Sequence, residues 1–242
     1  MITSKVVASF DEAVADIRDG SSVMVAGFAN VGAPHNLVSA LCRQGARDLT
    51  LIANSGANPR EGALTMATLI DDLRVKKVIF AFTASTHPSR PVGLQKLQAD
   101  GVVEAELVPQ GTLAERIRCG GAGIPAFYTP AAVGTELAAG KEHREFNGRT
   151  YLLEHALTAD YAFIRAWKAD EFGNLVFRQS QRNFNPIMAT AGDCTIVEAE
   201  EIVPVGSLDP DEIHTSGIWV QRIVKIGEGD TLHMKARLRD DA

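Results

Sequence analysis

The sequence is poor in the residues that mark disulfide-rich and metal-binding proteins. Its 242 residues include only three cysteines, which are widely spaced and form no CxxC pair (Cys42, Cys119 and Cys194). An odd, scattered set of cysteines argues against a disulfide framework and against a zinc site. The six histidines form no HxxH or HExxH pair. We therefore predict no bound metal, and cysteines that serve as small buried residues or unreactive thiols.

Long apolar runs and basic stripes are also missing. No apolar stretch reaches the roughly 18 residues needed to cross a membrane, and the N-terminus lacks a cleavable signal pattern. The formal net charge is −6, and basic residues form only short clusters such as Arg74, Lys76 and Lys77, unlike a nucleic-acid-binding surface. These absences predict a cytoplasmic protein without a membrane or nucleic-acid partner. They do not exclude an anionic substrate, because a ligand responds to the local field.

Aliphatic residues are plentiful, since 45% of the chain is hydrophobic and only 6% aromatic. In the first half, short apolar runs alternate with amphipathic stretches. Alternation of strand and helix implies right-handed crossovers. We therefore predict an α/β fold with a Rossmann-like, open and largely parallel sheet flanked by helices. The expected strands are residues 23–26, 49–53, 75–82 and 102–108, and the expected helices are residues 10–17, 34–41, 61–70, 92–99 and 112–119.

The second half contains short strand candidates in place of this alternation. Residues 170–174 are typical of a hairpin turn. No Pro- or Ser-rich linker, internal repeat or low-complexity segment divides the chain. We therefore expect the later strands to be added to the same core, in a single domain over residues 1–242. These later strand candidates are residues 150–153, 161–167, 175–177, 195–199 and 219–226.

The first candidate site is the glycine-containing loop between the strand at 23–26 and the helix beginning at Pro34. Glycines after a buried strand let a ligand approach the backbone, and a helix start offers unpaired N–H groups to an anionic or polar group. The spacing matches neither GxGxxG nor GxxxxGK[ST], so dinucleotide and Walker-type sites are poor interpretations. A tight turn without a ligand is the alternative. The candidate ligand-binding residues are Ala26, Gly27, Phe28, Ala29, Asn30, Val31 and Gly32.

Two amide side chains form the second candidate. Asn54 follows the strand at 49–53 and Gln110 follows the strand at 102–108, so both should lie at the carboxyl ends of strands, where open α/β sheets bind ligands. An amide there can donate a hydrogen bond to a carbonyl oxygen or a developing oxyanion. The alternatives are an ordinary Asn/Gly turn and a solvated helix face. On the helix after Gln110, Glu115 and Arg118 are i,i+3 neighbours and can pair.

No side chain stands out as a nucleophile. The serines lack a GxSxG elbow, and Cys194 has no evident base near it in sequence. No motif singles out one of the candidate carboxylates, which are Glu61, Glu136 and Glu154. The missing nucleophile is informative if the chain is half of an enzyme.

Four segments resemble the A subunit of the family I CoA-transferases, the 3-oxoacid group. They are residues 19–34, 109–130, 144–148 and 166–185. Together they span most of the chain in the family's order and spacing, so chance is a poor explanation. The matching strings include Asp19-Gly20, Gly27-Phe28, Gly32-Ala33-Pro34, Pro109-Gln110-Gly111-Thr112, Glu145-Phe146-Asn147-Gly148 and Arg182-Asn183-Phe184-Asn185.

The resemblance implies covalent chemistry. A glutamate carboxylate attacks the acyl-CoA carbonyl, the resulting anhydride recombines with CoA to give a glutamyl thioester, and a second acid then takes the CoA. In the family this glutamate lies in a Ser-Glu-Asn-Gly-type motif of the B subunit or of the C-terminal half of a fused chain. This sequence has no such motif, so the resemblance places the nucleophile on a partner B subunit, in a heterodimer or an A2B2 heterotetramer. It implies no permanently bound cofactor, with CoA entering as an acyl-CoA substrate.

By the same resemblance, the loop at 26–32 contacts CoA, while Asn54 and Gln110 line the active site. Two departures bear on this expectation. Ala26 stands where the family usually has a glycine, and Ser55 stands where it commonly has a second asparagine. Residues 82–88 also diverge from the family pattern, which bears on the choice of acceptor acid.

The expected donor is a succinyl-CoA-like thioester, and the expected acceptor is a 3-oxo acid such as 3-oxoadipate or acetoacetate. Residues 208–224 look closest to the 3-oxoadipate-type A subunits. One alternative is the A subunit of an acetate- or butyrate-type CoA-transferase. Another is a non-catalytic module of the same fold that binds a CoA ester or a sugar phosphate, since fold alone does not decide function.

Overall fold

The computed structural model describes residues 3–56, 63–83 and 93–230. Its main sheet has the strand order β11-β10-β8-β1-β2-β3-β4, with β9 pairing β8. Every pairing in this sheet is parallel except that of β8 with β9. The strands are β1 (Ser22–Val25), β2 (Leu49–Ser55), β3 (Val75–Phe82), β4 (Glu104–Leu107), β8 (Ala159–Asp170), β9 (Leu175–Val176), β10 (Gly192–Val203) and β11 (Arg222–Lys225).

Helices cover both faces of this sheet. Side chains alternate between the faces along each strand, and both sets are apolar, as expected for parallel strands buried on two sides. Val23, Leu51 and Val78 pack in one core with α1 (Phe10–Ala13), α2 (His35–Gln44), α3 (Met66–Asp71) and α4 (Gly93–Ala99). Met24, Ile52 and Ile79 pack in the other with α5 (Gln110–Gly121) and α6 (Asn185–Ala191). The predicted flanked parallel sheet is confirmed.

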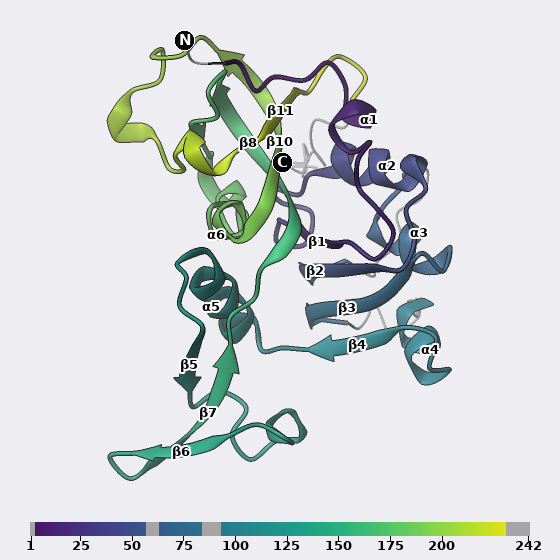
Figure 1. Ribbon diagram of the computed structural model, residues 1–242, viewed down its shortest axis with the longest axis vertical. Helices are drawn as coiled ribbons and strands as arrows, with labels where there is room; N and C mark the ends of the chain where they lie inside the picture. The colour runs from purple at the N-terminus through teal and green to yellow at the C-terminus, as the bar shows by residue number, and fades with distance from the viewer. Residues whose placement is uncertain (1–2, 57–62, 84–92, 231–242) are drawn as a thin grey trace, which may run out of the picture.

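A separate sheet of three antiparallel strands has the order β5-β7-β6. It contains β5 (Ala126–Thr129), β6 (His143–Phe146) and β7 (Arg149–His155). Figure 1 shows it at the bottom of the view, projecting away from the main sheet. The strand predicted at 150–153 therefore exists but does not join the main sheet. Asn147 and Gly148 both have positive φ, 50° and 74°, which is the signature of a two-residue hairpin turn between β6 and β7.

Most of the other strands were predicted within a few residues of their observed bounds, and the hairpin at Asp170 is confirmed. The Asp170 Oδ1 atom accepts hydrogen bonds from the backbone N–H groups of Phe172, Gly173 and Asn174. Helix α6 was not predicted, although Pro186 stands in its first turn, where proline is favoured. Short 3-10 turns complete the described chain: η1 (Glu136–Ala138), η2 (Gln179–Gln181), η3 (Pro210–Glu212) and η4 (Gly217–Trp219).

The first helix is shorter than predicted. The Ser9 hydroxyl caps it by accepting from the Glu12 N–H at 3.1 Å, but α1 ends at Ala13. Val14 and Ile17 are still buried, so the apolar pattern identified the inward face correctly. None of the helices in the described part of the chain has the length and apolar character needed to span a bilayer.

Candidate functional site

The predicted site residues gather at one edge of the main sheet. Strands β1, β2 and β4 are parallel neighbours or near neighbours, so their carboxyl ends face the same way. The chain leaves β1 into the loop at 26–34, β2 ends with Asn54 and Ser55, and α5 begins at Gln110 shortly after β4. This is the edge at which open parallel sheets bind ligands. Residues 57–62 and 84–92, which include Glu61 and most of the divergent 82–88 stretch, lie outside the described residues.

The loop after β1 forms a tight reverse turn with an exposed tip. Phe28 and Val31 exchange two backbone hydrogen bonds, each 3.0 Å long, and Ala29 between them has a φ of 54°. Phe28 and Val31 are 47% and 44% exposed, whereas Gly27 and Gly32 are buried. A Cβ atom on Gly27 would lie 2.8 Å from that of Ala33, so the arms of the turn pack too closely for any side chain. The tight-turn interpretation is thus correct as geometry, and the turn presents two apolar side chains outward.

Residues at and just before the start of α6 hold this turn in place. The Asn183 side chain donates to the Val31 carbonyl oxygen at 2.9 Å, and the Asn185 side chain donates to the Gly32 carbonyl oxygen at 3.0 Å. Asn185 is fully buried, and its side chain also donates to the Gln181 carbonyl oxygen at 2.7 Å. The first and fourth of the four resembling segments are therefore parts of one structure, which sequence spacing alone did not reveal.

The start of α2 does not offer free N–H groups to an anion, so that part of the sequence interpretation is wrong. One carboxylate oxygen of Glu198, on β10, accepts hydrogen bonds from the backbone N–H groups of Asn36 at 2.9 Å and Leu37 at 3.2 Å. The His35 N–H donates to the Ala33 carbonyl oxygen at 3.0 Å. The helix start is therefore capped from within the protein, and a ligand at this loop has to use other groups.

Glu198 belongs to a cluster of charged side chains centred on β8 and β10. Its side chain has no exposed surface and lies 3.4 Å from the guanidinium of Arg165, which is 3% exposed. Arg165 also contacts Glu200 at 3.1 Å, and Arg178 contacts Glu200 at 3.7 Å. Arg165 and Glu198 are directly opposite each other on β8 and β10. Burial raises the pKa of Glu198 above its ordinary value, against the opposing effects of Arg165 and the two helix N–H donors.

Asn54 carries a buried polar atom that finds no partner among the described residues. The residue is 6% exposed, and its side-chain oxygen makes no hydrogen bond within residues 3–56, 63–83 and 93–230. A buried polar atom without a partner costs free energy, and such atoms are uncommon in folded proteins. The position at the end of β2 agrees with the prediction, and the buried oxygen can accept a hydrogen bond from a ligand.

Gln110 is the first residue of α5 and is exposed. Pro109 before it provides no side-chain cap to the start of α5. Beside this helix start lies a cavity of about 390 Å³. Sequence reasoning missed the contribution of β5 to this cavity, which is lined by Pro109, Gly111, Thr112, Glu115, Phe127, Tyr128, Thr129 and Ala131.

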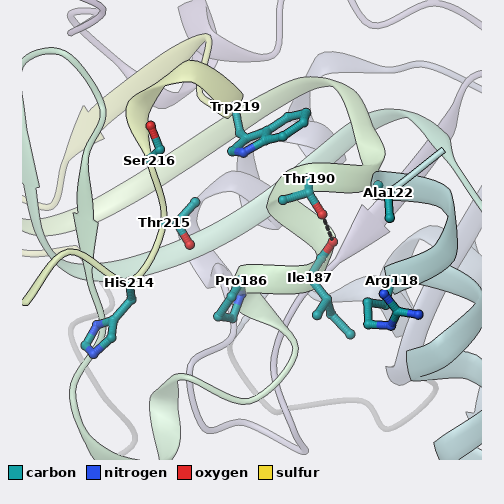
Figure 2. A pocket seen from close by; sticks show the side chains of 10 residues that line it. Arg118, Ala122, Pro186, Ile187, Thr190, His214, Thr215, Ser216 and Trp219 are labelled. Atoms are coloured by element: carbon teal, nitrogen blue, oxygen red, sulfur yellow. Dashed lines mark hydrogen bonds between the residues drawn. The ribbon is translucent and has the colours of Figure 1, made fainter.

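A second cavity, of about 360 Å³, lies further along α5 and contains none of the predicted site residues. Figure 2 shows Arg118 and Ala122 on one side, Thr190 and Ile187 on α6, and Trp219 above them. The helices cross closely here, since a Cβ atom on Gly121 would collide with the Thr190 side chain. Arg118 pairs with Glu115 at 2.7 Å, as predicted from their spacing.

The described residues provide no activated thiol. All three cysteines are free. Burial raises the pKa of the Cys42 thiol to about 11 and also raises those of Cys119 and Cys194. A thiol with a raised pKa is a poor source of thiolate. The groups that the site offers to a polar substrate are amides, hydroxyls and backbone groups, which can bind and orient it.

Comparison with known proteins identifies a family and relatives that match over most of their length. The family model described as "Coenzyme A transferase" matches residues 7–226. The A subunit of a probable succinyl-CoA:3-ketoacid coenzyme A transferase from Bacillus subtilis is 48% identical over 220 residues, covering 91% of this chain and 89% of that protein. The A subunit of the 3-oxoadipate CoA-transferase of Pseudomonas putida is 45% identical over 223 residues, covering 92% and 94%.

A solved structure shares the fold. The acyl-CoA transferase of E. coli O157:H7, in a thioester complex with CoA, superposes with a TM-score of 0.76 at 22% identity. The match covers 93% of this chain and 47% of that one. The chain thus spans about half the length of this structural neighbour.

Proposed function

Because the chain belongs to the coenzyme A transferase family, we propose that it is the A subunit of a two-chain enzyme that moves CoA from an acyl-CoA to a 3-oxo acid. The observation that carries the proposal is the 48% identity, over 91% of this chain, to a relative named as the A subunit of such an enzyme. The donor is a succinyl-CoA-like thioester. The acceptor is a 3-oxo acid such as acetoacetate or 3-oxoadipate, the two substrate classes in the names of the relatives.

The nucleophile belongs to the partner B subunit in this proposal. A glutamate there forms the glutamyl-CoA thioester, and this chain provides the other wall of the site. Two features of this chain support the division. The described thiols have raised pKa values, and the chain matches only 47% of the solved neighbour. The pair assembles as a heterodimer or a heterotetramer in the cytoplasm, without a permanently bound cofactor.

Each candidate residue has a role in this scheme. The loop at 26–32 contacts the acyl-CoA through its exposed apolar tip and its backbone. Asn54 and Gln110 donate side-chain hydrogen bonds at the reacting carbonyl, where charge develops in the transition state. Exclusion of water by the two chains protects the anhydride and thioester intermediates from hydrolysis.

A trapping experiment tests the division of labour. Succinyl-CoA is incubated with this chain alone, with the B subunit alone and with both, and tritiated borohydride then reduces any enzyme thioester to a labelled alcohol. We expect label only in the mixture, and only on the B subunit. A B subunit with its motif glutamate changed to glutamine is the control and should stay unlabelled. Label on this chain in the absence of the other would overturn the proposal.

A further inference from the structure

Glu198 acts as the helix cap that α2 lacks in its own sequence. The residue before the helix is Pro34, which has no side-chain hydrogen bond to offer. Glu198 comes from β10, 162 positions further along the chain than Asn36. One of its oxygens accepts both helix N–H groups, at 2.9 and 3.2 Å. A carboxyl group at this position interacts favourably with the positive end of the helix.

The strand pair β8 and β10 also holds the other end of the segment that leads from the loop into α2. The backbone N–H of Arg165, opposite Glu198 on β8, donates to the Asn185 side-chain oxygen at 2.8 Å. Asn185 in turn donates to the Gly32 carbonyl oxygen at 3.0 Å. The short segment from Gly32 to Leu37 is therefore fixed at both ends by β8 and β10, and the exposed turn that precedes it depends on both attachments.

We infer that Glu198 is a positioning residue for the acyl-CoA loop, which it holds through the start of α2 without touching the substrate itself. This inference rests on the proposed role of the loop at 26–32. It explains why a carboxyl group is buried completely at this edge, at the cost of desolvation. A purely structural ion pair needs only Arg165, whereas the Glu198 carboxylate is also shared with the helix that follows the loop.

Three variants test this inference in the complex of this chain with its B subunit. Glu198→Leu removes the acceptor at similar volume. Glu198→Gln keeps one oxygen for the two N–H groups and loses the charge, so it is the conservative rescue and remains useful if the leucine variant does not fold. Asn183→Ala releases the loop tip at a point that does not involve Glu198. Glu201→Gln is the matched control for all three, because Glu201 lies on the same strand as Glu198 and is 48% exposed.

Two measurements are combined. Hydrogen exchange should be faster over residues 27–37 in Glu198→Leu and unchanged in Glu201→Gln. The KM for succinyl-CoA should rise about tenfold in Glu198→Leu and about threefold in Glu198→Gln, while kcat and the KM for the acceptor acid stay near wild type. A general loss of folded protein would instead lower the apparent kcat and leave both KM values unchanged.

The outcomes separate the inference from the proposed function. If Asn183→Ala raises the KM for succinyl-CoA but neither Glu198 variant does, the loop role holds and the inference is wrong. Unchanged exchange over residues 27–37 in Glu198→Leu also overturns it. If none of the variants changes the KM for succinyl-CoA in an active complex, the loop does not contact the acyl-CoA. The inference then fails as well, because it depends on that contact. If the wild-type pair transfers no CoA, the proposed function itself fails.

Discussion

The Asn185 side chain donates a 3.0 Å hydrogen bond to the Gly32 carbonyl oxygen, joining two residues 153 positions apart in the chain. The bond attaches the turn after β1 to the start of α6. Neither residue is free to move, because Asn185 is fully buried and Gly32 packs against the Gln181 backbone. The candidate acyl-CoA loop is thus held by a contact between two segments that are far apart in the sequence.

Gly32→Ala should damage both folding and function. Gly32 has a φ of 67°, and a Cβ atom there would lie 2.5 Å from the Gln181 carbonyl oxygen. We expect a loss of about 2–4 kcal/mol in the free energy of unfolding and a higher KM for acyl-CoA, measured by urea unfolding and steady-state kinetics. The matched control is Gly123→Ala, because Gly123 has a φ of 69° but nothing within 4 Å of the added Cβ. Equal losses in the two variants would contradict the packing argument.

Asn54→Ala should lower activity without lowering stability. The Asn54 side-chain oxygen is buried and has no hydrogen-bond partner in the described part of the chain, so its removal should change the free energy of unfolding by no more than about 1 kcal/mol. We expect kcat/KM to fall by about one to two orders of magnitude. Asn185→Ala is the contrast, because that side chain makes three hydrogen bonds and its loss should cost about 3 kcal/mol. A large stability loss in Asn54→Ala would indicate a structural role.

Gln110→Ala should slow turnover more than it weakens CoA binding. Gln110 is exposed at the start of α5, so the free energy of unfolding should stay near wild type. If its amide stabilises a developing oxyanion, kcat should fall about 100-fold while the KM for acyl-CoA changes little. The control is Gln98→Ala, which truncates another exposed glutamine, in α4. Equal losses in kcat and in CoA affinity would argue against an oxyanion role.

Asp16 should make stability depend on acid pH. Its hydrogen bonds with Arg222, at 2.7 and 2.6 Å, hold the pKa of Asp16 below its ordinary value of 3.8. A lowered folded-state pKa stabilises the protein above the ordinary value, and this stabilisation is lost as pH falls through the lowered pKa. Because Asp16 is 53% exposed, the effect should stay below about 1 kcal/mol.

Urea unfolding at pH 5 and below measures this effect. Asp16→Asn removes the titrating carboxyl group and should flatten the pH dependence of the free energy of unfolding. Arg222→Gln should flatten it less, because a backbone hydrogen bond and Arg18 also lower this pKa. The double variant should flatten it no further than Asp16→Asn alone. Additive effects would show that the two groups act independently.

The strands of the main sheet were predictable because apolar runs between turn residues reflect burial on both faces. The run at Val75–Phe82 was predicted with its observed bounds. The separate sheet was harder to predict, because β6 is exposed along its whole length and so carries no apolar pattern. Its best signal was the Asn147-Gly148 pair, which is a strong hairpin dipeptide.

The candidate site was only partly predictable, for a physical reason. Residues at strand ends, such as Asn54 and Gln110, can be identified from their order in the chain. Contacts between distant segments cannot, and the cap that Glu198 provides to α2 is one of these. Within the sequence, Glu198 is one of four acidic residues in β10, and nothing near it specifies that its partners lie at Asn36 and Leu37.

The position of β1 between β2 and β8 has a consequence for synthesis on the ribosome. Strand β1 is made early, but its neighbour β8 spans Ala159–Asp170, so one edge of the nascent sheet stays unpaired until well over half of the chain has emerged. Open strand edges favour wrong pairing with other chains, and sheets closed by such distant contacts fold slowly. The N-terminal half is therefore the part of the nascent chain that most needs protection by chaperones until β8 has been synthesised.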